Sequence, residues 1–309
     1  MIATQPVPVA PAVPLVRRRP LAGSAVLSDY WAITKPEVNL LIGITTAAAF
    51  CIGTPAALPD FPWVKLLNTL LGTVLVASGA AALNQSIERR FDARMRRTAR
   101  RPVAAGRIEP IRALTFGTML SLAGLAYLVL AAGALASLLA AFTLLSYLFL
   151  YTPFKRVTPL CTAIGAVPGA VPPLIGWAAA RGTLDGEAWV LYAIVFLWQF
   201  PHFMAIAWMY RDDYDRAGYR VLPRGRSRAR FTTLQTLLPL QALLPVSLLP
   251  ALSGESSMFY GVGALLLGLG FCCYGIRFAV RRSGPAAHRL LLASILYLPV
   301  LFVLMILTS

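Results

Sequence analysis

Long apolar runs, separated by short polar and basic stretches, divide most of the chain into segments of similar length. Each run approaches the ~20 residues that an α-helix needs to cross the hydrocarbon core of a bilayer. We therefore expect an all-α integral membrane protein with nine transmembrane helices, at residues 38–58, 66–88, 112–131, 134–151, 159–179, 188–209, 232–251, 257–277 and 287–307.

The composition agrees with this pattern. Hydrophobic residues fill 58% of the 309 positions and charged residues only 13%, which is outside the range of soluble globular proteins. Residues 1–25 are rich in Pro, Ala and Val and lack the order of regions that marks a signal peptide. We expect a disordered cytoplasmic tail there, followed by a polytopic membrane domain at 26–309. From Ser24 to Pro36, a short amphipathic segment is expected to lie along the membrane surface.

The distribution of basic residues predicts an orientation. Of the 28 Lys and Arg residues, all except Lys65 and Arg181 fall where nine spans place them on one membrane face. Because Lys and Arg are enriched in cytoplasmic loops, the N-terminus is expected to be cytoplasmic and the C-terminus external. A net charge of +16 would suggest nucleic acid in a soluble chain. Here topology explains most of it, so we expect no nucleic-acid partner, while the basic surplus suggests an anionic ligand.

Two groups of acidic residues fall on that same predicted face. Asn84, Glu88 and Asp92 are spaced i, i+4 and i+8 at the end of the second span, which stacks three oxygen-bearing side chains along one helix face. Asp212 and Asp213 follow the sixth span, with Asp215 nearby. Each acid alone could form a salt bridge at a helix end. Together, the two groups favour a shared ligand.

Facing carboxylates repel each other unless cations lie between them. Mg²⁺ prefers a few carboxylates completed by substrate phosphates and water, so a diphosphate fits this arrangement. Basic side chains near both groups could neutralise the remaining phosphate charge. These are Arg94, Arg96, Arg97, Arg100, Arg101, Lys155 and Arg156.

Residues 165–177 contain three prolines and three glycines, which must kink or open the fifth span. The break could line a cavity, or it could allow close packing through small residues.

The four cysteines do not indicate a disulfide or metal site. All four lie in apolar segments without paired-ligand spacing, so neither a disulfide nor a zinc site is expected.

Several motifs resemble one family. The Asn-x-x-x-Glu-x-x-x-Asp pattern at 84–92, with the basic stretch up to Pro102, resembles the first signature of the UbiA superfamily of intramembrane prenyltransferases. Residues 151–158, 169–177, 198–203 and 212–218 resemble its heme O synthase branch, the protoheme IX farnesyltransferases. The resemblance extends from about residue 30 to 305. It implies a UbiA-type bundle of nine helices around a central cavity, located in the cell inner membrane.

The resemblance also implies a reaction. A farnesyl group would pass from farnesyl diphosphate to a vinyl group of heme b with addition of water, giving heme O. Mg²⁺ would be held by Glu88, Asp92, Asp212 and Asp213. Asn84, Arg97, Arg101, Lys155 and Arg156 would complete the catalytic site and stabilise the leaving diphosphate. Two features depart from the usual pattern, namely Glu88 where many members carry Asp, and a more basic stretch after Gly218.

His202 and Trp198 are the candidates for the heme side of the site. His202 is the one histidine expected inside a span, where ionisable residues are functional candidates, and a neutral imidazole can ligate heme iron. It could instead be a core histidine bonded to a backbone carbonyl. Trp198 could contact the isoprenoid or its cation, or simply pack. His288, beside Arg289 at a span boundary, is expected to be solvated.

Other functions remain open from the residues alone. The acceptor could be a hydroxybenzoate or a chlorin, because the diphosphate half of such a site would look alike. A membrane transporter for an organic anion would explain the arginines but not the paired acids. The expected partners are farnesyl diphosphate, heme b and the lipid bilayer. The family suggests a hand-over of product to heme A synthase or to cytochrome oxidase assembly.

Overall fold

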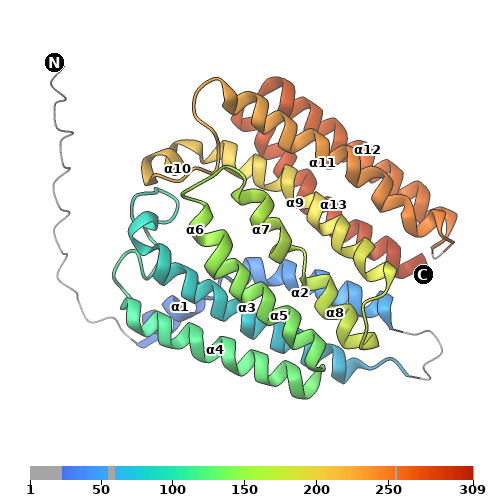
Figure 1. Cartoon of the computed structure of the whole chain (residues 1–309), viewed down its shortest axis with the longest axis horizontal. Coiled ribbons are helices and arrows are strands. Elements are labelled where there is room, and N and C mark those ends of the chain that lie inside the picture. The colour runs from blue at the N-terminus through green and yellow to red at the C-terminus, as the bar shows by residue number, and fades with distance from the viewer. Residues whose placement is uncertain (1–22, 55–59, 255, 309) are drawn as a thin grey trace.

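The computed structural model describes residues 23–54, 60–254 and 256–308, and these residues form helices and turns without a β-strand. Figure 1 shows the helices side by side in one bundle. Their bounds are α1 Gly23–Ile33, α2 Pro36–Gly53, α3 Trp63–Asp92, α4 Pro110–Ala131, α5 Ala134–Ser146, η1 Tyr147–Tyr151, α6 Thr152–Phe154, α7 Cys161–Gly169, α8 Pro172–Arg181, α9 Gly186–Met209, α10 Arg211–Ala217, α11 Ser227–Leu252, α12 Met258–Arg281 and α13 Gly284–Thr308.

The nine expected spans are confirmed. In the part of the chain that the structure describes, nine segments are long and apolar enough to cross a membrane, so this is a multi-pass membrane protein. The fourth joins α5, η1 and α6, and the fifth joins α7 and α8. The second runs to Asp92, beyond its expected end at residue 88, so that Asn84, Glu88 and Asp92 lie on one unbroken helix.

The N-terminal segment forms α1, as its amphipathic pattern predicted. The N–H of Arg107 Nε donates one bifurcated hydrogen bond to both Asp29 carboxylate oxygens, at 3.0 Å each, which connects α1 to the loop between α3 and α4. The Tyr30 ring contacts Phe116 of α4 edge-on, at 5.0 Å between ring centroids. Residues 1–22 of the expected tail lie outside the described residues, and α1 already covers 23–25.

The fifth span is broken, as its prolines predicted. Helix α7 ends at Gly169 and α8 begins at Pro172, where a missing N–H costs no helical hydrogen bond. The α8 half is fully enclosed, with Trp177 0% exposed. A Cβ at Gly176 would lie 2.0 Å from the Thr46 carbonyl oxygen of α2. Of the two alternatives for this break, the structure favours close packing through small residues.

The fourth span also departs from regular α-helix. Residues Tyr147–Tyr151 form a π-helical turn, η1, followed directly by the short helix α6. Such turns insert extra backbone into a helix and often occur at functional sites. Here the turn directly precedes Thr152 and Lys155, which both reach toward the acidic end of α3.

The loop between α3 and α4 and helix α10 pack against each other at one end of the bundle. Met95 of the loop is buried with Ala217 and Tyr219, and Phe91 and Tyr214 pack around them. The Thr98 hydroxyl donates to the Asp92 carbonyl at 2.9 Å, which caps the end of α3. This contact brings the two acidic groups, far apart in sequence, to the same end of the molecule.

Candidate active site

The Glu88 carboxylate is the best-connected group of the first acidic cluster. It is 3% exposed and accepts hydrogen bonds from Lys155 Nζ at 3.0 and 3.1 Å, Asn84 Nδ2 at 2.9 Å and the Tyr219 hydroxyl at 2.9 Å. The Thr152 hydroxyl lies 3.0 Å from Asn84 Oδ1 and 2.9 Å from the Tyr147 carbonyl, so its single proton is shared between these two acceptors. Buried charge is tolerated only when it is paired and hydrogen-bonded, and Glu88 satisfies both conditions.

The Glu88 carboxylate raises the pKa values of Lys155 and Tyr219. Burial alone would lower the pKa of Lys155, but the neighbouring Glu88 charge outweighs it and holds that pKa well above its usual value. Burial and the same carboxylate both raise the pKa of the Tyr219 phenol. Lys155 is therefore an ammonium and Tyr219 a neutral donor at physiological pH.

The Asp92 carboxylate pairs with a second basic side chain, that of Arg101. Its carboxylate, in a residue 1% exposed, accepts both hydrogen bonds from Arg101 NH1, at 3.0 and 2.9 Å. The first cluster thus holds two buried carboxylates one helical turn apart, each neutralised by a basic side chain from another segment. Direct pairing explains why two like charges remain this close.

The second cluster divides into a buried and an exposed acid. Asp213 is 8% exposed, accepts a hydrogen bond from the Arg97 backbone N–H at 3.2 Å and pairs with Arg216. The Asp212 side chain is 80% exposed, with Arg211 Nε at 3.7 Å. Only Asp213 is therefore fixed by the fold, and Asp212 is free to reorient.

Asp215, which the sequence places near Asp212 and Asp213, pairs with arginines outside the two clusters. Arg228 donates to its carboxylate at 2.7 Å, and Arg224 lies at 3.8 Å. These arginines belong to the basic stretch after Gly218. Part of that stretch therefore fixes α10 against the start of α11.

Two guanidinium groups near the clusters lie against aromatic rings and have no carboxylate partner within the described residues. Arg97 donates to the Tyr214 hydroxyl at 3.3 Å and lies 4.8 Å from the centre of the Tyr210 ring. Arg156 lies 3.8 Å from the centre of the Phe91 ring, and its buried Nε has no hydrogen-bond partner there. Aromatic faces hold both groups in place while leaving their charge uncompensated. An anion beside the clusters would compensate the positive charge of Arg97 and Arg156.

Lys35 is a residue that sequence reasoning missed. It precedes Pro36 at the start of α2 in a left-handed conformation, with φ 53°. Burial, followed by the positive charges of Arg101 and Lys155, lowers the pKa of Lys35 to about 7. The signal was available in the sequence as a lysine directly before a helix-starting proline. Tyr219 and Thr152 were missed as well, because nothing local marks them.

No metal ligand set is complete by itself. Within residues 23–54, 60–254 and 256–308, no three or more His, Cys, Asp or Glu side chains lie together closely enough to hold a metal ion. The donor chemistry nevertheless fits Mg²⁺, because this ion needs only one or two carboxylates when substrate phosphates and water complete its shell. Glu88 and Asp92 are buried carboxylates that already bind cations, those of Lys155 and Arg101.

His202 and Trp198 lie between α9 and α13, where both contact Ser294. The indole N–H of Trp198 donates to the Ser294 carbonyl at 2.8 Å, and the His202 ring stacks on Trp198 at 4.7 Å. The Ser294 hydroxyl donates to the Leu291 carbonyl at 2.6 Å, so it accepts from His202 Nδ1 at 2.8 Å. A hydroxyl has one proton to give, which assigns the imidazole proton to Nδ1 and a free lone pair to Nε2.

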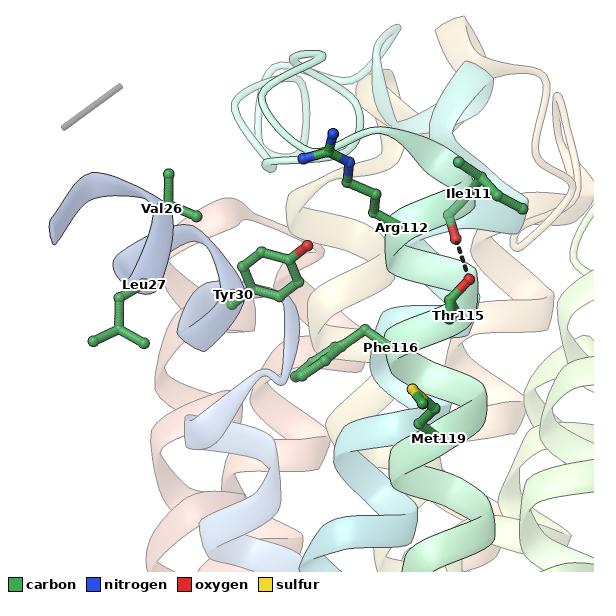
Figure 2. Close-up of a pocket in the computed structure, with 8 residues that line it drawn as sticks. All are labelled: Val26, Leu27, Tyr30, Ile111, Arg112, Thr115, Phe116 and Met119. Carbon is green, nitrogen blue, oxygen red and sulfur yellow. Dashed lines mark hydrogen bonds between the residues drawn. The ribbon is translucent and has the colours of Figure 1, made fainter. Parts of the chain in front are cut away.

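A groove lined by neither acidic cluster lies between α1 and α4. It has a volume of about 730 Å³ and is lined by Val26, Leu27, Tyr30, Ile111, Arg112, Thr115, Phe116 and Met119. In Figure 2, the Tyr30 and Phe116 rings lie next to each other, whereas Arg112 points away from Phe116 and Met119. Arg112 pairs with Glu109 at 3.4 Å. An apolar lining without a carboxylate does not fit a catalytic centre.

Comparisons with known proteins identify the family of this chain. The model of the UbiA prenyltransferase family matches residues 41–304. The chain belongs to the UbiA prenyltransferase family. Among curated members, it is 50% identical to the protoheme IX farnesyltransferase of Solibacter usitatus over 287 residues, covering 91% of this chain and 98% of that protein. It is 42% identical to the protein of that name from Koribacter versatilis, covering 95% of this chain and 97% of that protein.

Solved structures of UbiA proteins share the fold. A digeranylgeranylglyceryl phosphate synthase matches with a TM-score of 0.72 at 16% identity, covering 91% of this chain and 97% of that one. A UbiA homolog from Archaeoglobus fulgidus, bound to GPP and Mg²⁺, matches with a TM-score of 0.61 at 13% identity, covering 90% and 99%. The family and enzyme class expected from the motifs, an intramembrane prenyltransferase, are thereby confirmed.

Proposed function

We propose that this UbiA protein transfers a farnesyl group from farnesyl diphosphate to a vinyl group of heme b, with addition of water. The name of its curated relatives, protoheme IX farnesyltransferase, supports the farnesyl group and the heme acceptor. The single observation that carries the proposal is the buried acidic pair of Glu88 and Asp92 beside Arg97 and Arg156, whose guanidinium groups have no carboxylate partner in the described parts of the chain. This arrangement suits a substrate that brings both negative charge and metal ions.

The chain's own side chains would act mainly on the diphosphate. When the allylic carbon–oxygen bond breaks, its electron pair leaves on the diphosphate, and negative charge grows there. Arg97 and Arg156, whose charge has no carboxylate partner within the described residues, would stabilise it with Lys155 and Arg101. The vinyl carbon of heme attacks farnesyl C1, and water adds to the resulting cation and loses a proton.

Mg²⁺ would be held by Glu88 and Asp92 on one side and by Asp212 and Asp213 on the other. When bound, it would add positive charge at the leaving diphosphate. The exposed Asp212 can turn toward it without breaking a buried contact, since its side chain is 80% exposed. Asn84 would keep Glu88 oriented through its 2.9 Å hydrogen bond.

His202 would orient the heme. Its proton lies on Nδ1, so Nε2 offers the lone pair that ligates iron in heme proteins. Trp198, 3% exposed and bonded to α13, would support the imidazole by stacking rather than bind the isoprenoid itself. The expected spectrum of His202→Ala with bound heme therefore loses the signature of nitrogen ligation.

Orientation is part of the proposal. We place the protein in the cell inner membrane with the N-terminus and the acidic clusters on the cytoplasmic side, because all but two of its 28 basic residues fall on that face. Alkaline phosphatase fused after Ser309 should be active, since the enzyme folds only outside the cytoplasm. An inactive fusion at normal protein level would reverse the assignment.

The deciding experiment uses purified protein in detergent with heme b, farnesyl diphosphate and Mg²⁺, beside an EDTA control, with extracted hemes measured by mass spectrometry. A metal-dependent hydroxyethylfarnesyl heme is expected. Asp92→Ala should abolish it, whereas Asp185→Asn, an exposed acid paired with Arg181 at 3.6 Å, should not.

Other outcomes point elsewhere. Diphosphate release with unchanged heme would overturn the acceptor and favour a hydroxybenzoate or chlorin. If neither occurs in folded protein, prenyl transfer is wrong, and uptake of organic anions into vesicles becomes the measurement to make.

A further inference from the structure

A small basic cavity lies between the end of α12 and the start of α13, and that turn lies at the same end of the bundle as α10 (Figure 1). Its volume is about 230 Å³. We call it the arginine pocket, and its lining residues are Tyr274, Arg277, Arg281, Ser283, Pro285, Ala286 and Arg289. Three arginines from two helices thus line one small space.

The positive charge of the arginine pocket has no acidic counterpart. Residues 258–309 contain neither Asp nor Glu. In the described parts of the chain, none of the ion pairs involves Arg277, Arg281 or Arg289. The orientation of the protein explains why arginines lie on this face. It does not explain why three of them share a cavity, where they repel one another unless an anion is present.

The geometry of the pocket suits a phosphate group. Tyr274, Arg277 and Arg281 follow one face of α12 at i, i+3 and i+7, and Arg289 approaches from α13. Guanidinium forks bind phosphate oxygens with paired hydrogen bonds. The start of α13 also opens here, with Ser283 Oγ accepting from Ala286 N at 3.4 Å. The positive end of that 25-residue helix adds to the attraction.

Apolar surface continues from the pocket toward the middle of both helices. Ile276 and Val280 of α12 are 53% and 71% exposed, and Leu292 and Leu296 of α13 are 53% and 63% exposed. The pocket itself lies at the ends of two membrane spans, the level at which lipid phosphates are found. A ligand with an anionic head and apolar chains would match both surfaces at once.

We propose that the arginine pocket binds the phosphate headgroup of an anionic phospholipid, whose acyl chains lie along the exposed apolar faces of α12 and α13. Basic pockets between transmembrane helices are suited to such headgroups. The site is separate from the acidic clusters and does not depend on the proposed transfer reaction.

The test is thermal unfolding of the full-length protein in neutral detergent, with added phosphatidylglycerol, phosphatidylcholine, sodium phosphate or sodium diphosphate. A lipid that binds only the folded state raises Tm with concentration, which gives an apparent Kd. Phosphatidylglycerol should stabilise the wild-type protein more than phosphatidylcholine. Each basic residue near the membrane surface contributes about fivefold in affinity, so the variant R277Q/R281Q/R289Q should lose on the order of 100-fold.

Arg112→Gln provides the matched control. This arginine is equally exposed and basic but pairs with Glu109, so the response to phosphatidylglycerol should stay within about twofold of wild type. If the triple variant does not fold, Arg277→Gln alone should weaken the lipid by about fivefold.

Three results would overturn the proposal. One is an unchanged phosphatidylglycerol response in the arginine variants. Another is equal stabilisation by phosphatidylcholine, which would indicate general lipid solvation. The third is equal, arginine-dependent stabilisation by phosphate or diphosphate, which would make the pocket a site for soluble anions.

Discussion

Removing the ammonium of Lys155 should destabilise the protein strongly, because it leaves the Glu88 carboxylate buried without its cation. Glu88 is 3% exposed and the Lys155 side chain 13%, so water can replace little of the lost pairing. Breaking a buried ion pair on one side costs about 3–5 kcal/mol. At about 2 °C per kcal/mol for a large domain, Lys155→Met should lower the apparent Tm by roughly 6–10 °C.

A double-mutant cycle measures the interaction energy between Glu88 and Lys155 apart from the other effects of each substitution. Glu88→Gln should cost less than Lys155→Met, since a lone buried lysine can lose its proton. The double variant should recover at least about 2 kcal/mol relative to the sum of the single changes. Farnesyl transfer should stay low in all three variants, so recovered stability without recovered turnover distinguishes folding from chemistry.

The assay is unfolding in detergent followed by tryptophan fluorescence, with turnover measured separately. As a control, Arg112→Met removes an exposed pair at 3.4 Å and should change stability by less than about 0.5 kcal/mol. Additive effects in the cycle, or a Lys155→Met protein as stable as the control, would refute the reasoning that a buried charge needs its partner here.

Three further predictions follow from burial and charge. Gly176→Ala should destabilise the protein by about 1–3 kcal/mol or more, because the added methyl would lie 2.0 Å from a backbone oxygen. Gly43→Ala is the control, since Gly43 has open space around it, and this change should be neutral or stabilising. Tm measurements compare the two variants. Folding lowers the pKa of Lys35 from 10.5 to about 7, so the unfolded chain binds that proton more tightly and the unfolding free energy should rise with pH between about 7 and 10.5. Denaturant titrations across that window should show a flatter slope for Lys35→Met. Asp213→Asn should cost about 1–3 kcal/mol, because its carboxylate accepts buried hydrogen bonds, and Asp212→Asn should leave Tm nearly unchanged.

Much of the fold was predictable because the bilayer imposes it. A helix in hydrocarbon must satisfy its own backbone, so apolar length alone identified the nine spans. The prolines around residue 170 predicted the broken fifth span correctly. Whether that break lined a cavity or packed closely depended on which helix faced it, and the contact between Gly176 and Thr46 could not be deduced from spacing.

The candidate site was predictable where its members share a helix. Asn84, Glu88 and Asp92 were found from the 3.6-residue period. Lys155 and Arg101 were expected near the acidic groups, but the pairing of Lys155 with Glu88 across 67 residues was not predicted, and Tyr219, 131 residues from Glu88, was missed. Contacts at such separations depend on how helices pack, and local patterns carry no information about it.

The π-helical turn η1 sets the direction in which the end of the fourth span faces. An α-helix turns ~100° per residue, so backbone inserted at Tyr147–Tyr151 changes the direction in which every later residue of that span faces. Thr152 and Lys155 reach Asn84 and Glu88 from the far side of this insertion. Deleting one residue of the turn would give a more regular helix, yet one whose polar residues point elsewhere. The irregular turn is therefore needed for stability as well as for the site, because a straightened span would leave the buried Glu88 carboxylate without the Lys155 cation.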